Sequence, residues 1–252
     1  MRHAALRPDA PAIVDGEITL TFAELQALAA RTAAGFESLG VEPGDRVAIA
    51  AANDLGFVGA YLGALWCGAV AVPLNPLAPV VAHATEIERV GAKVLVCGSG
   101  VDHLLGLPGA IVSSALPDCP PMAAEVERDD SELAVLLFTS GTAGAPRAAM
   151  LTHGNLAANI GQVQSHPGLS VGPADVGLAT LPFFHVFGLN VALGVALAGG
   201  VRSVLMAQFD AAGAVELIRR EGATIVAGVP GMFARRAVRN ESDGASDSES
   251  MR

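Results

Sequence analysis

One short stretch of the chain gathers hydroxyl groups, glycines and a cation. Residues 138–153 read FTSGTAGAPRAAMLTH and follow an apolar run from Leu133 to Phe138. A loop of this composition presents backbone N–H groups and side-chain donors to an anion, and the guanidinium of Arg147 matches phosphate oxygens in shape and charge. The residues after Arg147 have the pattern of a helix start, and a helix N-terminus would add partial positive charge. The stretch therefore predicts a phosphate-binding connection between a strand and a helix.

Other known loop motifs do not match the chain. Neither the GxxxxGK[ST] phosphate loop nor the G-x-S-x-G turn of serine hydrolases occurs in residues 138–153. A second loop, which begins Gly98-Ser-Gly100, starts like a dinucleotide-binding turn, but His103 stands where the third glycine is needed. A polar connection without any ligand remains an alternative for residues 138–153.

The elements that must position this loop alternate along the chain. A capping box at Thr21 and Glu24 predicts a helix that runs to Leu39, with Gly40 at its end. Further helices are expected over residues 53–67, 79–90, 152–164, 187–197 and 210–222, the last capped by Asp210. Strands are expected over residues 46–51, 69–74, 93–97, 110–113, 133–139, 176–182, 201–206 and 223–230. This rhythm predicts a layered α/β fold with mostly parallel sheets flanked by helices.

Composition limits the classes of function. The formal net charge of −10 argues against nucleic acid, whose binding requires a basic surface. Cys67, Cys97 and Cys119 are odd in number and widely spaced, which predicts neither a zinc site nor a disulfide framework. The first residues, MRHAALRPDAPAIV, lack the apolar core of a signal peptide, so a reducing cytoplasm is the expected compartment.

Two apolar stretches raise a membrane alternative. Phe57 to Leu74 and Val176 to Val201 are each long enough for a membrane-spanning helix. However, both contain several glycines, and Pro73 and Pro182 interrupt them. Each stretch is better explained by a short helix and a strand, buried between layers and broken by a turn. An integral membrane protein is the less favoured interpretation.

Residues 138–153 strongly resemble the phosphate-loop signature of the adenylate-forming (AMP-binding) superfamily, whose usual form is close to T-S-G-T-T-G-x-P-K-G followed by a T-H pair. Other segments agree in order: the stretch LTFAELQALAARTAAGFESLGVEPGDRVAIAAAN, then FVGAYLGALWCGAVAVPLNPLAP, LPFFHVFGL and GATIVAGVPGMF. The resemblance covers about residues 10 to 239. Within the superfamily, the chain looks most like the fatty-acyl or aryl-acyl CoA ligases.

The resemblance implies a reaction and a set of site residues. ATP and a carboxylate would give an acyl-adenylate and pyrophosphate with Mg²⁺, and the acyl group would then pass to the thiol of CoA or of a carrier protein. The residues implied to hold the β- and γ-phosphates are Thr139, Ser140, Gly141, Thr142, Gly144 and Arg147. His185 would lie beside the acyl carboxylate, and Val229, Pro230 and Gly231 would border the acyl pocket. For His185 a purely structural role within a cluster of phenylalanines is the alternative, and the apolar run around it predicts burial in either case.

The chain also departs from the superfamily pattern. Ala143 replaces a usual Thr, and Arg147 replaces the commoner Lys. Ala148 stands where Gly is common, and this replacement predicts a less mobile loop. The later motifs of the superfamily are not found in residues 232–252. Those motifs would supply the adenine pocket, a Mg²⁺-binding Glu, a ribose-binding Asp and a catalytic Lys. We therefore assign no catalytic or metal-binding residue.

The domain organisation follows from these departures. Residues 1–239 are expected to form the N-terminal part of an adenylation domain, residues 240–252 a disordered acidic tail, and the C-terminal lid domain to be absent. We expect the chain to lack ligase turnover by itself. A non-catalytic alternative is a binding or partner-docking module that self-associates through an exposed sheet edge.

Overall fold

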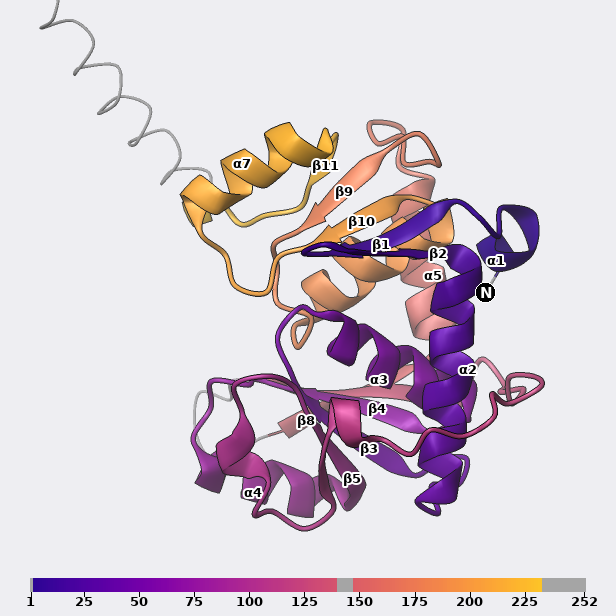
Figure 1. The fold of residues 1–252 in the computed structure, drawn as a ribbon, viewed down its shortest axis with the longest axis vertical. Coiled ribbons are helices and arrows are strands. Elements are labelled where there is room, and N and C mark those ends of the chain that lie inside the picture. The colour runs from indigo at the N-terminus through magenta and orange to yellow at the C-terminus, as the bar shows by residue number, and fades with distance from the viewer. Residues whose placement is uncertain (1, 140–146, 233–252) are drawn as a thin grey trace, which may run out of the picture.

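The computed structural model describes residues 2–139 and 147–232, which form two β-sheets with helices between and outside them (Figure 1). Sheet A has the strand order β11-β9-β10-β1-β2 and sheet B the order β6-β5-β3-β4-β7-β8. All pairs are parallel except β1 with β2 and β7 with β8, at one edge of each sheet. The prediction of mostly parallel sheets flanked by helices is confirmed.

The strands are short. Sheet A contains β1 (Pro11–Asp15), β2 (Ile18–Thr21), β9 (Val176–Ala179), β10 (Arg202–Leu205) and β11 (Ile225–Val226). Sheet B contains β3 (Arg46–Ala50), β4 (Val70–Leu74), β5 (Ala92–Cys97), β6 (Ala110–Val112), β7 (Leu133–Thr139) and β8 (Arg147–Thr152). The central strand β4 is buried along its whole length, as expected for a parallel strand covered on both faces.

The α-helices are α1 (Arg2–Leu6), α2 (Phe22–Ser38), α3 (Leu55–Trp66), α4 (Val80–Val90), α5 (His153–Gln164), α6 (Ala196–Gly199) and α7 (Ala211–Glu221). A π-helix (Phe187–Val195) precedes α6, and two 3₁₀ helices occupy Asp102–Leu104 and Ser113–Ala115. Helices α2 and α3 lie between the two sheets, whereas α4 and α7 lie on their outer sides (Figure 1).

The apolar core follows these layers. The largest cluster joins Ile13 of sheet A, Phe36 and Phe57 of the middle helices and Ile49 of sheet B, all fully buried. Smaller clusters fill the spaces between sheet B and α4 and between sheet A and α7. Because the middle helices have both sheets as neighbours, the two sheets share one core.

Helix starts agree with the predicted caps. The Thr21 hydroxyl accepts a hydrogen bond from the Glu24 amide at 3.2 Å, and the Glu24 carboxylate accepts one from the Thr21 amide at 2.8 Å. Asp210 caps α7 by accepting from the Gly213 amide at 2.7 Å. These bonds satisfy amides that lack partners in the first turn of a helix.

The structure corrects several sequence expectations. Residues 147–152 form the strand β8, antiparallel to β7, so a strand rather than a helix start follows the phosphate loop. Strands β1 and β2 were not predicted. The segment expected as a helix over 187–197 is a π-helix over most of its length. The Gly98-Ser-Gly100 loop needs no correction: a 3₁₀ helix of three residues follows it, in agreement with the sequence argument against a dinucleotide-binding turn.

The two apolar stretches form short buried elements. The first contains α3 and β4, and the second contains β9, the π-helix and α6. Within residues 2–139 and 147–232, none of the helices has both the length and the apolar character needed to cross a bilayer.

Candidate functional site

Thr139 and Arg147 stand opposite each other where β7 ends and β8 begins. They are register partners in the antiparallel pair, and the Thr139 hydroxyl donates to the Arg147 carbonyl oxygen at 3.4 Å. Both side chains are exposed. A hydroxyl and a guanidinium are therefore presented side by side at the carboxyl end of β7, as phosphate binding would require.

The remaining predicted phosphate ligands, Ser140, Gly141, Thr142 and Gly144, lie outside the described residues, as does Ala143, so their roles stay predictions. The predicted contribution of a helix N-terminus is wrong. Helix α5 begins at His153, and the six residues of β8 separate it from the loop. Ala148 lies in β8 opposite Phe138, so it belongs to a strand pair and not to the loop.

The segment after β9 is positioned by Asn53, which follows β3 and is 4% exposed. Its amide nitrogen donates to the carbonyl oxygens of Ala179 at 3.3 Å and Leu181 at 2.8 Å. Its amide oxygen accepts from the Phe183 N–H at 2.9 Å. Three hydrogen bonds from one buried side chain thus connect the end of sheet B strand β3 to the segment that carries His185.

His185 is exposed and ends the turn that begins at Pro182. Its backbone N–H donates to the Pro182 carbonyl at 3.1 Å, and its ring lies 4.4 Å from that of Phe184, centroid to centroid. The expected burial of the imidazole is wrong. Phe183 is buried instead, packed on Phe57 with ring centroids 5.3 Å apart, so it takes the core position. The imidazole is left available for a ligand.

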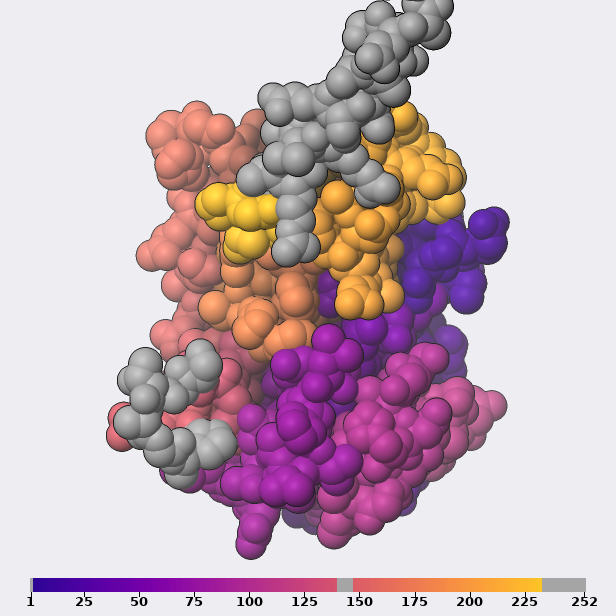
Figure 2. All heavy atoms as spheres, turned by 90° about the vertical axis from the view of Figure 1, so that its left-hand side faces the viewer, coloured from indigo at the N-terminus to yellow at the C-terminus, as the bar shows by residue number. Residues whose placement is uncertain are grey.

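Val229, Pro230 and Gly231 follow β11 and are exposed. Because β11 pairs in parallel with β9, the carboxyl ends of both strands point the same way. These residues and the segment of His185 therefore follow the strands on the same side of sheet A. The Thr180 hydroxyl donates to the Ala227 carbonyl at 2.8 Å and joins the two segments. In Figure 2 the orange and yellow parts of sheet A lie above the purple and magenta sheet B region on this side of the molecule.

The space beside the predicted acyl-binding residues is small. A cavity of about 30 Å³ lies between the end of β11 and α7, lined by Thr180, Val226, Gly228, Met232 and residues of α7. That volume holds about one water molecule. This cavity is therefore too small to enclose an acyl group.

Sequence reasoning missed the two aspartates that lie beside Asn53. Asp54 caps α3 by accepting from the Phe57 amide at 2.8 Å, and Asp15, at the end of β1, accepts from the Leu55 amide at 3.0 Å. Burial raises the pKa of the Asp54 carboxyl, and the charge of Asp15 raises it further. The sequence Asn53-Asp54 before an apolar helix is a cap signal that could have identified Asp54.

A family model described as AMP-binding enzyme matches residues 1–251 of the chain. The chain belongs to the AMP-binding enzyme family. Among its relatives, 4-coumarate-CoA ligase 1 of Narcissus pseudonarcissus is 31% identical, over 97% of this chain and 48% of the relative. Feruloyl-CoA synthase of an Amycolatopsis species is 34% identical, over 92% of this chain and 48% of the relative. The chain thus spans about half the length of the curated relatives it matches.

Solved structures have the same fold as this chain. O-succinylbenzoate coenzyme A synthetase of Bacillus subtilis, in complex with AMP, matches with a TM-score of 0.83 and 28% identity, over 94% of this chain and 62% of that one. ATP-bound MatB of Rhodopseudomonas palustris matches with a TM-score of 0.78 and 27% identity, over 92% of this chain and 50% of that one. The fold is that of the N-terminal domain of adenylate-forming ligases.

The family implies Mg²⁺, and the side chains of this chain can be tested for it. In the described part of the chain, His, Cys, Asp and Glu nowhere gather in a group of three or more that could hold a metal ion. The described residues therefore contain no metal site built from three or more such side chains, whereas Mg²⁺ beside ATP needs only one or two carboxylates and the phosphates. Arg147 is a cation that they place next to the predicted phosphate-binding residues.

Proposed function

We propose that the chain binds ATP and forms part of an enzyme that activates a carboxylate as an acyl-adenylate and passes it to CoA. The observation that carries the proposal is the pairing of Thr139 with Arg147 at the end of β7 in a chain of the AMP-binding enzyme family. The names of the relatives favour an aryl acid of the hydroxycinnamate type over a fatty acid. A carrier-protein thiol is the second possible acceptor, and the cytoplasm is the proposed compartment.

The reaction is a displacement at phosphorus. A carboxylate oxygen attacks the α-phosphorus of ATP, the bond to the bridging oxygen breaks, and pyrophosphate leaves. Donors and cations aimed at the phosphate oxygens lower the barrier because negative charge develops there. In this scheme the loop from Thr139 to Arg147, with Ser140, Gly141, Thr142 and Gly144, holds the β- and γ-phosphates. Mg²⁺, when it accompanies ATP, supplies further positive charge.

The acyl side of the reaction falls to sheet A. His185 lies beside the carboxylate in the proposed complex, and Val229, Pro230 and Gly231 border the acyl group. Support comes from the common edge of sheet A from which both segments leave, and from the exposure of the imidazole. Asn53 then acts as a positioning residue through its bond to the Phe183 amide.

Nucleotide titration tests the phosphate role. We expect the purified 252-residue chain to bind ATP, and Arg147→Ala to weaken binding by roughly 10- to 100-fold, because a hydrogen bond to a charged group contributes about 1.5 to 3 kcal/mol. Arg147→Lys keeps the charge and serves as the matched control, with a smaller loss expected. Unchanged affinity in Arg147→Ala would remove the phosphate role from this residue.

Turnover is a separate question. The adenine, ribose, magnesium and lysine motifs of the superfamily are not found in residues 232–252, so we propose that this chain alone does not turn over. Hydroxylamine trapping of acyl-adenylate, with 4-coumarate and ATP as substrates, measures this directly. Product formed by the purified chain would contradict the proposal.

A second candidate function is non-catalytic binding. It is favoured by the two-residue strand β11, which stands at an edge of sheet A in the described residues. Exposed strand edges pair readily with other chains. Size-exclusion chromatography at several protein concentrations distinguishes the two, because a concentration-independent monomer contradicts self-association.

A further inference from the structure

His83 is a buried histidine that takes no part in the proposed reaction. It lies near the start of α4, on the outer side of sheet B, and the residue is 0% exposed. Ile87, four residues later on the same face of the helix, belongs to the apolar cluster between α4 and the sheet. An imidazole ordinarily changes its charge close to physiological pH. His83 therefore places a group that titrates under mild conditions inside an apolar layer.

The contacts of the ring fit a neutral imidazole. Nδ1 lies 3.2 Å from the carbonyl oxygen of Pro79, and we assign the single ring proton to Nδ1, from which it donates to that oxygen. Nε2 is buried, and among the described residues it has no hydrogen-bond partner. A second proton on Nε2 would therefore be buried without a partner at hydrogen-bond distance, which is unfavourable.

The net effect of the surroundings is to disfavour the charged ring. Burial lowers the pKa of His83 and is the largest effect. The carbonyl groups of Pro79 and Asn75 act in the opposite direction, and the charge of His103 lowers the pKa further. The N-terminal end of α4 adds partial positive charge, which also opposes protonation. The neutral ring is thus the form that the folded chain favours.

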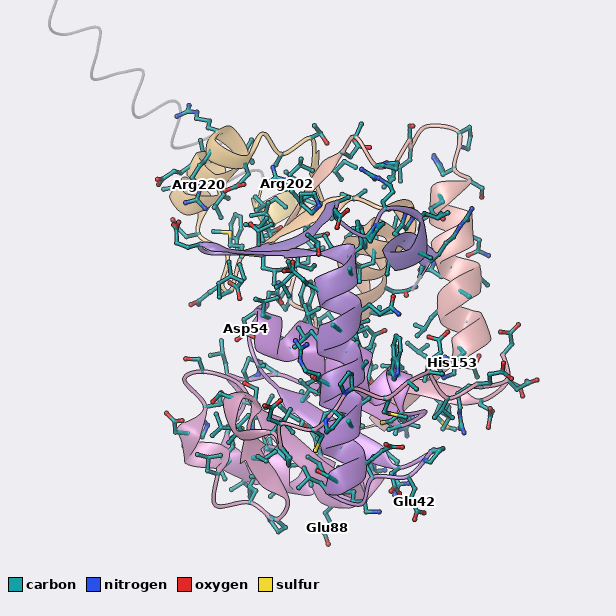
Figure 3. The ribbon with its side chains drawn as sticks, turned by 45° about the vertical axis from the view of Figure 1, so that its right-hand side comes forward. Glu42, Asp54, Glu88, His153, Arg202 and Arg220 are labelled. Carbon is teal, nitrogen blue, oxygen red and sulfur yellow. The ribbon has the colours of Figure 1, made fainter. Side chains whose placement is uncertain are left out.

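In the described part of the chain, no carboxylate offsets this effect. Strands β4 and β7, which contribute to the apolar cluster beneath α4, contain no titratable residue. Arg46 and Lys93 lie near the amino ends of β3 and β5, away from the start of α4, and have partners of their own. Figure 3 shows Glu88 of α4 pointing away from the molecule. The remaining titratable residues of α4, β5 and the 3₁₀ helix after β5 are Glu86, Arg89, Cys97, Asp102 and His103. Of these, His103 is the one whose charge shifts the pKa of His83.

The start of α4 has few other restraints. Pro79 precedes the helix and provides no side-chain cap. Its carbonyl oxygen accepts from the amides of Ala82 at 2.9 Å and His83 at 3.2 Å, besides the imidazole. Val81 is 77% exposed, and the buried residues of α4 are His83 and Ile87. The ring of His83 is therefore the buried side chain that anchors this end of the helix.

The start of α4 lies at the same edge of sheet B as the candidate phosphate-binding residue Thr139. Strands β4 and β7 are parallel neighbours, with Ala71 opposite Val135. The connection from β4 to α4 therefore leaves the sheet at the edge where β7 ends at Thr139. A change in this connection alters the surroundings of the candidate site.

We propose that His83 is an acid-sensitive latch that fastens the start of α4 to sheet B. While the ring is neutral, its Nδ1–H is bonded to the Pro79 carbonyl, and the segment from Asn75 to Val90 stays closed on the sheet. When the ring takes up a proton, the state in which it reaches water gains stability, and the segment opens. The latch belongs to the fold and does not depend on the proposed function.

The direction of the pH effect follows from the lowered pKa. The neutral ring contributes its full stabilisation above the ordinary pKa of 6.5. This contribution is lost as the pH falls from that value through the lower pKa of the folded chain. Mild acid therefore opens the segment beside the Thr139 edge of sheet B, whereas helices without a buried histidine keep their protection.

Hydrogen exchange measured by mass spectrometry tests the latch in the 252-residue chain. Protection of peptides from α4 is compared at about pH 7.5 and about pH 5.5, after correction for the pH dependence of the intrinsic exchange rate. We expect α4 to lose protection by roughly threefold or more at the lower pH. Helix α7, which contains no histidine, should keep its protection. An equal loss in both helices, or no loss in α4, would overturn the proposal.

Matched variants assign the effect to one ring. His83→Gln keeps an N–H donor for the Pro79 carbonyl but does not titrate, so its α4 protection should be the same at both pH values. His166→Gln removes an exposed imidazole and should retain the loss seen in the parent chain. A loss in His83→Gln as large as in the parent would refute the latch.

His103→Gln gives a second readout in which His83 itself is unchanged. His103 opposes the protonation of His83, so its removal brings the pKa of the folded chain closer to the ordinary value. We therefore expect a smaller loss of α4 protection at the lower pH than in the parent chain. A larger loss would contradict the proposal, because His103 would then have to favour the charged ring.

Discussion

The amide oxygen of Asn53 accepts a hydrogen bond from the backbone N–H of Phe183 at 2.9 Å, across a boundary between the two sheets. Asn53 follows β3 of sheet B, whereas Phe183 follows β9 of sheet A. Phe183 lies two residues before the exposed His185, and its ring packs on that of Phe57 in α3. The position of the candidate carboxylate-binding imidazole therefore depends on a residue from the other sheet.

Replacing Asn53 with Ala should destabilise the fold. The variant leaves the Phe183 amide and the carbonyls of Ala179 and Leu181 without their partner in a buried site. We expect a loss of roughly 2 to 4 kcal/mol in the free energy of unfolding, measured by urea denaturation. Asn75→Ala is the control, because Asn75 is exposed and its side chain makes one hydrogen bond within the described residues, accepted from the Leu77 amide. Equal losses in the two variants would contradict the bridging role.

Gly188 is needed in the first turn of the π-helix that follows His185. A Cβ atom at this position would lie 2.1 Å from the Pro182 carbonyl oxygen, which belongs to the backbone. Gly188→Ala should therefore cost at least about 2 kcal/mol of unfolding free energy, because the turn must shift to admit the methyl group.

A second glycine provides the control for that measurement. Gly161 lies in α5, and a Cβ there would meet no atom within 4 Å. Gly161→Ala should stabilise the chain by roughly 0.5 to 1 kcal/mol, because alanine restricts the unfolded backbone more than glycine does. Thermal unfolding of both variants would show opposite shifts. A shift of the same sign in both would refute the steric explanation for Gly188.

The hydrophobic periodicity of the sequence predicted the buried elements well. Strand β4 and helix α3 are apolar throughout and have few other stable arrangements in water. Strand β8 was missed because its residues, RAAMLT, show no clear alternation and suit a helix equally well. It is a strand because the open edge of β7 offers hydrogen-bonding partners, which is a tertiary effect.

The β1–β2 hairpin could have been predicted. The sequence places Asp15-Gly16 between two apolar runs, a strong short-range hairpin signal, and Gly16 has a φ of 58°.

The exposure of His185 could not have been predicted from the sequence. Hydrophobic periodicity describes an average environment, and it does not say which of several adjacent aromatic residues enters the core. Phe183 takes that place through its contact with Phe57, which lies 126 positions earlier in the numbering.

Asp54 should make the stability of the chain depend on pH. Folding raises the pKa of its carboxyl above the ordinary value of 3.8, through burial first and the charge of Asp15 second. Its stabilising contribution is therefore complete below pH 3.8 and is lost as the pH rises through the folded pKa. Asp54→Asn keeps a side chain that caps α3 equally well and removes the buried charge.

We therefore expect Asp54→Asn to be more stable than the parent chain at pH 7, with the difference shrinking as the pH approaches 4. Urea unfolding at both pH values measures the change, at low protein concentration because the pI is about 4.9. Asp129→Asn is a suitable control, because hydrogen bonds from Ser131 lower the pKa of that exposed carboxyl and the sign should reverse. If Asp54→Asn were less stable than the parent at pH 7, the charge of Asp54 would have to be favourable in the folded state, contrary to its burial beside Asp15.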